Sequence, residues 1–354
     1  MIRLYNIGII GYGGMAGWHA KYIDLYEKTK VKGIFDINPE RNRFAQDKGY
    51  TIYESIDTLL NDSDVDAVII ATTNEVHKEL SIKAMAAGKH VICEKPVALN
   101  AAELEEIIAA SKRYNRIFTV NQNRRTNRDF TLMQQSVESG LIGDIYTLES
   151  RVQGARGIPK GWRATKELGG GMMLDWGVHL IDQIMHMIDE KVASVYCNMY
   201  FIEYPEVDDS FCLTMIFESG LAAIVEVSTN SYIKLPRWYV RGKSGTLKID
   251  DWECGAEIVR GIDKENVWDN EIPHTKAGFS KTMASRDTDS IEQLIIPQST
   301  EPFDDLIIVY EQFISAIRGN AKLTITPEQA LRVMKVIDAA FLSHETSNVI
   351  KVNI

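Results

Sequence analysis

Apolar residues follow two different spacings along the first third of the chain. Short apolar runs predict β-strands, and segments whose apolar residues recur every three or four positions predict helices. The two patterns alternate up to about residue 123, which is typical of a parallel sheet with helices on both faces. The expected strands are residues 3–10, 31–36, 66–73, 89–93 and 116–122, and the expected helices are 18–28, a helix opening at Pro39, 75–88 and 101–115.

The spacing changes from about residue 124, where a second domain is expected. A helical segment at 128–140 is followed by strand-like runs with short turns between them, which predicts a largely antiparallel sheet. Residues 263–302 are polar and poorly periodic, and we expect a lid or a variable segment there. The runs cover 145–154, 193–202, 208–217, 221–229, 237–242, 245–251 and 256–261, and helices at 304–319 and 327–345 end the pattern. The sequence therefore predicts an α/β domain at 1–123 and an α+β domain at 124–354.

One segment of the second domain carries two distinct faces. It reads GGGMMLDWGVHLIDQIMHM, residues 169–187. Successive helical residues are about 100° apart, so Asp175, His179, Asp182 and His186 share one face beside an apolar stripe. Such a face can hold a metal ion, transfer a proton or do neither. Motifs elsewhere in the sequence are needed to choose between these interpretations.

Composition narrows the class of protein. The 354 residues, 45% hydrophobic and 25% charged, are typical of a globular chain long enough for two cores. No apolar run is long enough for a membrane span, and the N-terminus lacks a signal-peptide pattern. A formal charge of −10 argues against nucleic acid and membrane surfaces as partners. The four cysteines form no CxxC pair, so we expect a cytoplasmic protein.

The chain begins with a phosphate-binding pattern. Strand 3–10 runs into GYGGMAG, residues 11–17, and then into a helix, which is the context that a GxGxxA fingerprint needs. Gly11 permits the tight turn, Gly13 lets the backbone approach a pyrophosphate, and the N–H groups at the helix start receive the phosphate. The neighbouring residues Tyr12, Gly14 and Met15 are expected at the same cofactor.

Asp36 indicates which dinucleotide binds. It ends the second strand, near the distance from Gly11 at which a carboxylate binds the adenosine ribose hydroxyls. A carboxylate there repels a 2′-phosphate, so NAD is the predicted cofactor. NADP stays open as an alternative because Arg41 and Arg43 lie close in sequence.

Three further motifs carry a family resemblance: ATTNEVH at 71–77, HVICEKPVALN at 90–100 and GGGMMLDWGVHLIDQ at 169–183. With them, essentially the whole chain resembles the Gfo/Idh/MocA oxidoreductases, which include glucose–fructose oxidoreductase and inositol dehydrogenases. The resemblance implies a Rossmann domain for NAD(P) at 1–123 and a substrate-binding and oligomerisation domain at 124–354. It also implies a homodimer or homotetramer formed through the antiparallel sheet.

The resemblance implies positions for the site as well. Lys95 of Glu-Lys-Pro lies beside the nicotinamide and substrate in such proteins, often before a cis bond to Pro96. Asp175 and His179 match the aspartate and histidine of the later motif. Cofactor contacts are implied for Thr72, Thr73, Asn74, His77, Glu94, Lys95, Asn123, Trp162 and Arg163, and Arg124 is expected to line the same cleft.

These residue types suit hydride transfer. Oxidation of an alcohol by NAD⁺ releases a hydroxyl proton, and an imidazole can take it and return it in the reverse direction. His179 is therefore predicted as general base and acid, and Lys95 as the donor that stabilises developing alkoxide charge. Asp175 would hold a second hydroxyl or favour the charged form of its neighbours.

Simpler interpretations stand beside this one. Asp175 can serve as a first-turn acid, His179 as a core histidine and Lys95 as a solvated side chain. A metal site is a further alternative, but His186 lies about 10–11 Å from His179 along a helix axis, too far to share one ion. We expect no metal, with Asp182 supporting the helix and His186 packing.

The leading hypothesis is an NAD(P)-dependent oxidoreductase acting on a hydroxyl or carbonyl carbon of a sugar, cyclitol or related polyol. One alternative is a non-catalytic dinucleotide-binding sensor or scaffold. Another is a lyase or hydrolase that uses a retained NAD. The sequence does not name the substrate, because stereochemistry is read by a few side chains from variable loops.

Overall fold

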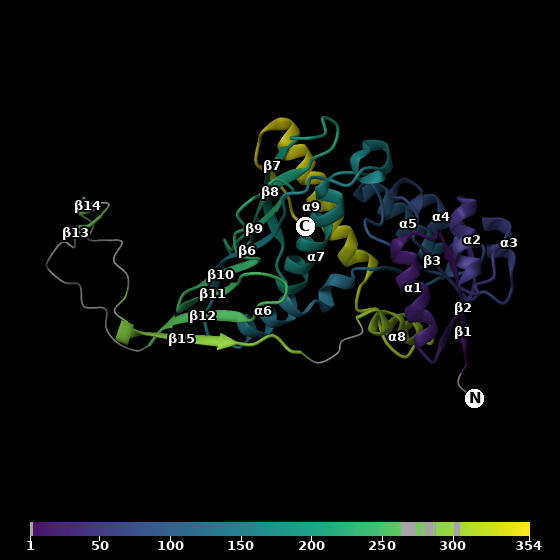
Figure 1. The fold of residues 1–354 in the computed structure, drawn as a ribbon, viewed down its shortest axis with the longest axis horizontal. Coiled ribbons are helices and arrows are strands. Elements are labelled where there is room, and N and C mark those ends of the chain that lie inside the picture. Colours follow the sequence, from purple (N-terminus) through teal and green to yellow (C-terminus); the bar gives the residue numbers. More distant parts are fainter. Residues whose placement is uncertain (1–2, 263–273, 277, 280–285, 287, 301–304) are drawn as a thin grey trace.

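The computed structural model describes residues 3–262, 274–276, 278–279, 286, 288–300 and 305–354. Two bodies lie side by side, one built on a five-stranded sheet and the other on a nine-stranded sheet (Figure 1). Among the described residues, no helix combines the length and the apolar character that crossing a bilayer requires.

The first body is a parallel sheet with the order β2-β1-β3-β4-β5. The chain leaves β1 for β2 on one side and then crosses to β3 on the other. The carboxyl ends of β1 and β3 therefore flank a crevice, which is where open α/β sheets bind ligands. Its elements are β1 (Tyr5–Ile10), α1 (Gly14–Leu25), β2 (Thr29–Phe35), α2 (Pro39–Asp47), α3 (Ile56–Asn61), β3 (Ala67–Ile70), η1 (Asn74–Val76), α4 (His77–Ala86), β4 (His90–Cys93), α5 (Ala101–Tyr114) and β5 (Phe118–Val120).

The second body is a mixed sheet ordered β15-β12-β11-β10-β6-β9-β8-β7-β16, in which β6 and β9 pair in parallel and the other neighbours pair antiparallel. Helices α6, α7 and α9 cover one face (Figure 1). The strands are β6 (Ile145–Gln153), β7 (Val192–Tyr200), β8 (Ser210–Phe217), β9 (Ala222–Ser228), β10 (Trp238–Gly242), β11 (Gly245–Ile249), β12 (Ala256–Gly261), β15 (Ile291–Ile296) and β16 (Ile350–Lys351).

The remaining elements are η2 (Asn123–Thr126), α6 (Arg128–Glu138), η3 (Trp162–Ala164), η4 (Lys166–Leu168), η5 (Met173–Gly177), α7 (Val178–Met187), β13 (His274–Thr275), β14 (Gly278–Phe279), η6 (Thr288–Ser290), α8 (Asp305–Ile317) and α9 (Pro327–Thr346). The parallel first sheet and the mostly antiparallel second sheet confirm the predicted fold class. Residues 291–296 of the expected lid form the edge strand β15, and much of that segment, including 263–273, lies outside the described residues.

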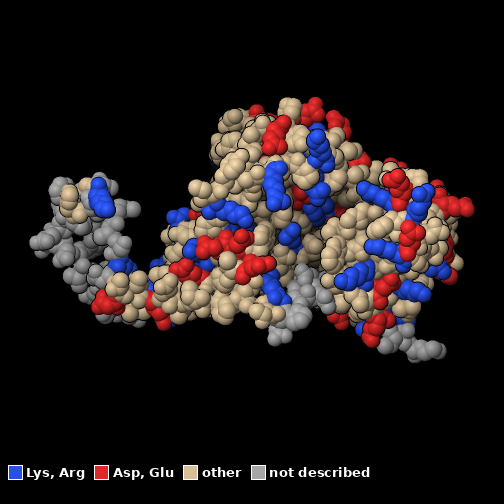
Figure 2. All heavy atoms as spheres, viewed as in Figure 1, with Lys and Arg blue, Asp and Glu red and all other residues tan. Residues whose placement is uncertain are grey.

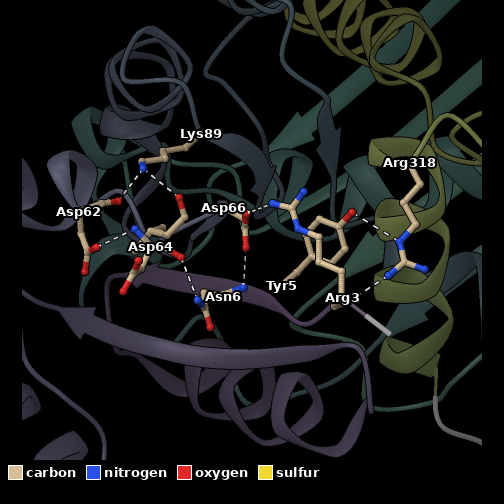
Figure 3. A network of polar contacts seen from close by, with 9 residues as sticks. Arg3, Tyr5, Asn6, Asp62, Asp64, Asp66, Lys89 and Arg318 are labelled. Atoms are coloured by element: carbon tan, nitrogen blue, oxygen red, sulfur yellow. Dashed lines mark hydrogen bonds and ion pairs between the residues drawn. The ribbon is translucent and has the colours of Figure 1, made fainter. Parts of the chain in front are cut away.

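Helix α8 returns from the second half of the chain to the first body. Its residues Tyr310 and Phe313 are buried in the same apolar cluster as Ile23 of α1. Just after the helix, the Arg318 guanidinium donates to the Tyr5 hydroxyl at 3.4 Å and to the Arg3 carbonyl at 3.1 Å (Figure 3). The C-terminal part of the chain therefore also stabilises the sheet that begins at the N-terminus.

Candidate active site

A cleft of about 1040 Å³ lies between the two bodies. Pockets for one small ligand are commonly about 300–1,000 Å³, so this cleft has room for a dinucleotide and a small substrate. On the face drawn in Figure 2, acidic and basic side chains are interspersed, and the surface is indented where the bodies meet. The predicted site residues that line the cleft are Gly11, Gly13, Gly14, Met15, Asp36, Thr72, Thr73, Asn74, Glu94, Lys95, Asn123, Trp162, Arg163, Asp175 and His179.

The glycine turn is shaped for close backbone approach. Gly11 has φ +88°, and a Cβ there would lie 2.6 Å from the Ala71 carbonyl oxygen, so no other residue fits. Helix α1 begins at Gly14, and no side chain of the described residues caps its first N–H groups. Those groups are free to bind the pyrophosphate of a dinucleotide.

Asp36 lies at the end of β2 with a largely buried carboxylate. Its Oδ2 accepts the Tyr12 backbone N–H at 2.6 Å, and its Oδ1 accepts that of Asn38 at 2.7 Å. The Arg41 guanidinium is 3.8 Å from Oδ2. The carboxylate is thus fixed in the cleft wall, where its remaining lone pairs can accept ribose hydroxyls.

Two predicted cofactor residues do not reach the cleft. The Tyr12 ring turns to the other side of the loop, where it packs against Phe44 and Tyr50 with ring centroids 6.3 Å away in each case. His77 is fully buried, with Nδ1 2.8 Å from the Pro96 carbonyl. Its imidazole therefore ties the start of α4 to the loop of Lys95, whose bond to Pro96 is cis.

Lys95 and Arg163 hold the two carboxylate oxygens of Asp175. The Lys95 ammonium donates to Oδ1 at 2.9 Å and to the Asp175 backbone carbonyl at 2.9 Å. The Arg163 Nε donates to Oδ2 at 2.8 Å. Burial alone would raise the pKa of Asp175, but these two cations lower it below its ordinary value. Asp175 therefore stays ionised and orients both cations in the cleft.

His179 lies next to this ion cluster with very little exposure. Burial lowers its pKa well below the ordinary 6.5, and the positive charges of Lys95, Arg124 and Arg237 lower it further. No hydrogen-bond partner for its Nδ1 is found in the described part of the chain. The imidazole is therefore neutral at pH 7, the form that can accept a proton.

The periodicity predicted one regular α-helix that carries both Asp175 and His179. The structure instead places them in two different helical segments. Met173–Gly177 form a single π-helical turn, and α7 begins only at Val178. Such turns are often found at functional sites. Asp208 supports this turn, since its Oδ2 accepts the Met173 N–H at 2.7 Å and a Cβ at Gly171 would overlap its Oδ1.

Glu94 forms a buried network behind Lys95. Its Oε1 is 2.7 Å from His19 Nε2 and accepts the Asn121 amide at 2.7 Å, while Tyr310 of α8 lies on the other side of His19. Burial alone would raise the pKa of Glu94, but the contact with His19, the Asn121 amide and the charge of Lys95 lower it. The loop that carries Lys95 is therefore braced by groups from α1, β5 and α8.

The other two ionisable residues of the 169–187 segment do not line the cleft. Asp182 accepts Arg125 Nε and Nη2, each at 2.7 Å, in a buried bidentate pair. His186 packs near Phe130, with ring centroids 6.3 Å apart. Within the described ranges, no cluster of three or more histidine, cysteine or acidic residues could hold a metal ion.

Sequence reasoning missed two residues near the site. Arg237, at the start of β10, is fully buried against the rings of Trp238 and Trp252. Trp252 lies in the turn between β11 and β12 and contacts Trp176 of the cleft wall, with centroids 5.7 Å apart. Neither belongs to a motif, and a buried arginine runs against the usual distribution of charged residues.

The fold and the cleft define a Rossmann-type oxidoreductase with an NAD(P)-binding domain. Residues 5–122 match the family described as "Oxidoreductase family, NAD-binding Rossmann fold", and residues 130–248 match the GFO/IDH/MocA C-terminal domain. The chain belongs to the Gfo/Idh/MocA oxidoreductase family, as its motifs predicted.

Similar proteins fit this assignment. A solved NAD-binding protein from Listeria innocua is 40% identical with a TM-score of 0.94, covering 99% of this chain and 100% of that one. The scyllo-inositol 2-dehydrogenase (NADP(+)) of Bacillus subtilis is 26% identical over 98% of this chain and 95% of its own length. The 2,7-anhydro-N-acetylneuraminate hydratase of Escherichia coli is 27% identical over 72% of this chain and 70% of its own.

Proposed function

We propose that this protein transfers a hydride between NAD and a hydroxyl or carbonyl carbon of a sugar, cyclitol or related polyol, with Lys95, Asp175 and His179 as catalytic residues. The observation that carries the proposal is the contact of Lys95 with Asp175, which joins the two bodies beside His179 in one cleft. The similarity to an inositol dehydrogenase supports the substrate class.

The cofactor supplies the hydride acceptor or donor, and the protein supplies position and charge. Lys95 donates a hydrogen bond to the reacting oxygen and stabilises negative charge that develops there. His179, neutral before reaction, accepts the hydroxyl proton during oxidation and returns it during reduction. Asp175 holds the Lys95 ammonium in position through its carboxylate and its backbone carbonyl.

Asp36 supports a preference for NAD over NADP. Its carboxylate is fixed in the cleft by two backbone N–H groups, so it cannot turn away from a 2′-phosphate. Arg41 lies close enough to keep NADP as an alternative. The proposed division places the cofactor on residues 1–123 and the substrate on 124–354, with α8 as a support for the first domain.

The proposal extends to a homodimer or homotetramer in the cytoplasm that assembles through the second sheet. Its face opposite α7 and α9, called here the open sheet face, carries Ile224 beside Thr214 of β8 and Glu149 of β6. These side chains are only partly exposed in the monomer, which leaves apolar and charged groups available to a second copy.

The test follows nicotinamide absorbance with inositols, aldoses and their oxidised forms, using both NAD and NADP. Reversible oxidation of at least one polyol, lost in Lys95→Met, supports the proposal. Tight cofactor binding without turnover of any compound would instead favour a sensor.

A retained-cofactor lyase or hydrolase is the second candidate, favoured by the similarity to a protein named as a hydratase. Product formed without net nicotinamide change, together with cofactor that co-purifies with the protein, would mark it.

A further inference from the structure

Arg125 lies where the chain passes from the first body to the second. It is part of η2, which follows β5, and only 9% of its surface is exposed. Its Nε and Nη2 donate to the two carboxylate oxygens of Asp182 on α7, each at 2.7 Å. A bidentate arginine–carboxylate pair fixes direction as well as distance, so this contact sets how η2 lies on α7.

The same guanidinium also holds a second connection between the bodies. The chain returns from α8, which packs on the first body, through residues 318–326 to α9, which packs on the second sheet and on α7. Arg125 Nη1 donates there to the Thr324 carbonyl at 3.2 Å and to Gln329 Oε1 at 2.9 Å. Residues 121–127 and 318–326, called here the two connecting segments, therefore lie side by side at Arg125.

Helix α7 is tied to the first connecting segment at two consecutive residues. Asp182 holds the Arg125 side chain, as described above. The next residue, Gln183, is fully buried, and its amide donates to the Arg124 backbone carbonyl at 2.7 Å. A side-chain contact and a backbone contact thus act together, and the first connecting segment cannot shift along α7 while both hold.

His179 lies between two contacts that reach across the bodies. It is about one turn before Asp182 on α7, and the preceding turn carries Asp175, which contacts Lys95 of the first body at 2.9 Å. Neither Arg125 nor Asp182 is among the described residues that line the cleft. The pair can therefore act on His179 only through the helix that they hold.

A buried ion pair is weak evidence for stability, because the cost of removing two charges from water offsets much of their attraction. Geometry is a better account of this one, since a single guanidinium joins α7 to both connecting segments. We propose that Arg125 is a positioning residue that fixes the angle between the two bodies and thereby the distance from the His179 imidazole to the nicotinamide. The inference rests on the proposed function and adds to it a residue that touches neither substrate nor cofactor.

Two variants separate positioning from stability. Arg125→Lys keeps the charge and loses the bidentate contact with Asp182. Arg125→Met combined with Asp182→Val replaces the pair with apolar side chains of similar total volume, a change that is often neutral or stabilising. Lys89→Met is the matched control, because Lys89 is a buried cation of the first body whose Nζ donates to the carbonyls of Asp62 and Val65 at 2.7 and 2.8 Å (Figure 3).

The first readout needs no turnover. Hydrogen exchange of the NAD-loaded protein is followed in peptides that cover residues 93–97 and 173–179, which contact each other across the cleft. Exchange there should be about tenfold or more faster in both Arg125 variants, because loosened bodies break that contact more often. In Lys89→Met these peptides should exchange as in the unaltered protein. Acceleration confined to the two connecting segments would overturn the inference.

The second readout is the primary deuterium isotope effect on kcat. It is measured with NADH deuterated at the transferred position and the oxidised compound of the panel that reacts fastest. Both Arg125 variants should show kcat lowered by about 10–10²-fold and a larger isotope effect, because a misplaced donor makes hydride transfer slower than the other steps. NAD affinity should change little, since the glycine turn and Asp36 are untouched. An unaltered kcat and isotope effect in these variants would overturn the inference, and so would the same changes in Lys89→Met.

The two proposals fail in different ways. Without nicotinamide-linked turnover in the unaltered protein, the proposed reaction is contradicted, and the exchange measurement still decides whether Arg125 fixes the two bodies. Turnover in the unaltered protein with the same kinetics in both Arg125 variants overturns the positioning role and leaves the oxidoreductase assignment intact.

Discussion

The Lys95 ammonium contacts Asp175 twice, at the backbone carbonyl and at carboxylate Oδ1, each at 2.9 Å. The two residues come from different bodies, and both side chains are largely buried. The ion pair therefore fixes the first body against the second at the point where the chemistry is proposed. Because the Lys95 charge is proposed to act in the reaction and not in cofactor binding, its removal should lower turnover and leave NAD affinity largely unchanged.

Lys95→Met keeps the length of the side chain and removes its charge. We expect kcat to fall by about 10²–10³-fold, because the reacting oxygen loses its donor and Asp175 loses a partner. NAD affinity should change little, since the glycine turn and Asp36 are untouched. Steady-state kinetics and cofactor fluorescence titration measure the two effects. Lys83→Met, which removes a half-exposed lysine of α4, is the control, and full activity in Lys95→Met would contradict the mechanism.

The pH profile of kcat/KM should report His179. Its pKa is lowered by burial and by three nearby cations, so the acid limb of oxidation is expected below pH 6.5. His179→Asn should lower kcat by about 10²–10⁴-fold and abolish that limb. His186→Asn changes the same helix outside the cleft and should retain the limb. An acid limb that persists in His179→Asn would assign the proton to another group.

The strands of the first body could be predicted because their environment leaves a clear pattern. All four residues of β3 are buried, as expected for a central parallel strand, and its sequence AVII is continuously apolar. The edge strand β15 is half-exposed and lies in a polar segment, so its pattern was too weak to recognise. The position of α8 was equally hidden, because an apolar stripe shows that a helix packs but not against which sheet.

Most of the residues that the motifs singled out line the cleft, and their roles there stay predictions. Tyr12 and His77 show the limit, because a motif gives a position in the chain but not the direction of a side chain. Arg237 and Trp252 show another limit, since they flank the paired strands β10 and β11 and come into contact with each other in the folded sheet. Such contacts depend on tertiary structure and leave no local signal.

Asp36 should control the choice between NAD and NADP. Asp36→Asn keeps an oxygen that can accept the Tyr12 N–H and removes the charge that repels a 2′-phosphate. The ratio of kcat/KM for NADP to that for NAD is expected to rise by about tenfold or more, as loss of one like-charge contact predicts. Asp47→Asn on the exposed side of α2 is the control. An unchanged ratio would show that Asp36 does not face the 2′ position.

Assembly through the open sheet face can be tested at Ile224. A charge at its centre should prevent two copies from pairing, so Ile224→Arg is expected to give a species near the 39.9 kDa monomer mass. Leu25→Arg alters an exposed apolar residue of α1 and should leave the assembly unchanged. Light scattering after size-exclusion chromatography gives the masses. A monomeric unaltered protein, or an Ile224→Arg oligomer, would contradict the proposed interface.

Asp208 should make stability fall as pH rises. Burial raises its folded pKa to about 8, whereas an aspartate in the unfolded chain titrates at about 3.9. Between these values the folded protein holds a proton that the unfolded chain has released, so the free energy of unfolding decreases across this window. Ionisation of Asp208 thus disfavours the turn that presents Asp175.

Asp208→Asn removes this titration and keeps an oxygen that can accept the Met173 N–H. The variant should gain about 4 kcal/mol relative to the unaltered protein between pH 5 and pH 9, because only the unaltered protein loses stability as the pH rises from 5 to the folded pKa of about 8. Urea unfolding at both pH values measures the difference, and Asp189→Asn, at an exposed position after α7, corrects for the loss of one carboxylate. Parallel pH dependence in Asp208→Asn and the unaltered protein would contradict the raised pKa of Asp208, and the turn would then be supported by an ionised carboxylate that accepts the Met173 N–H.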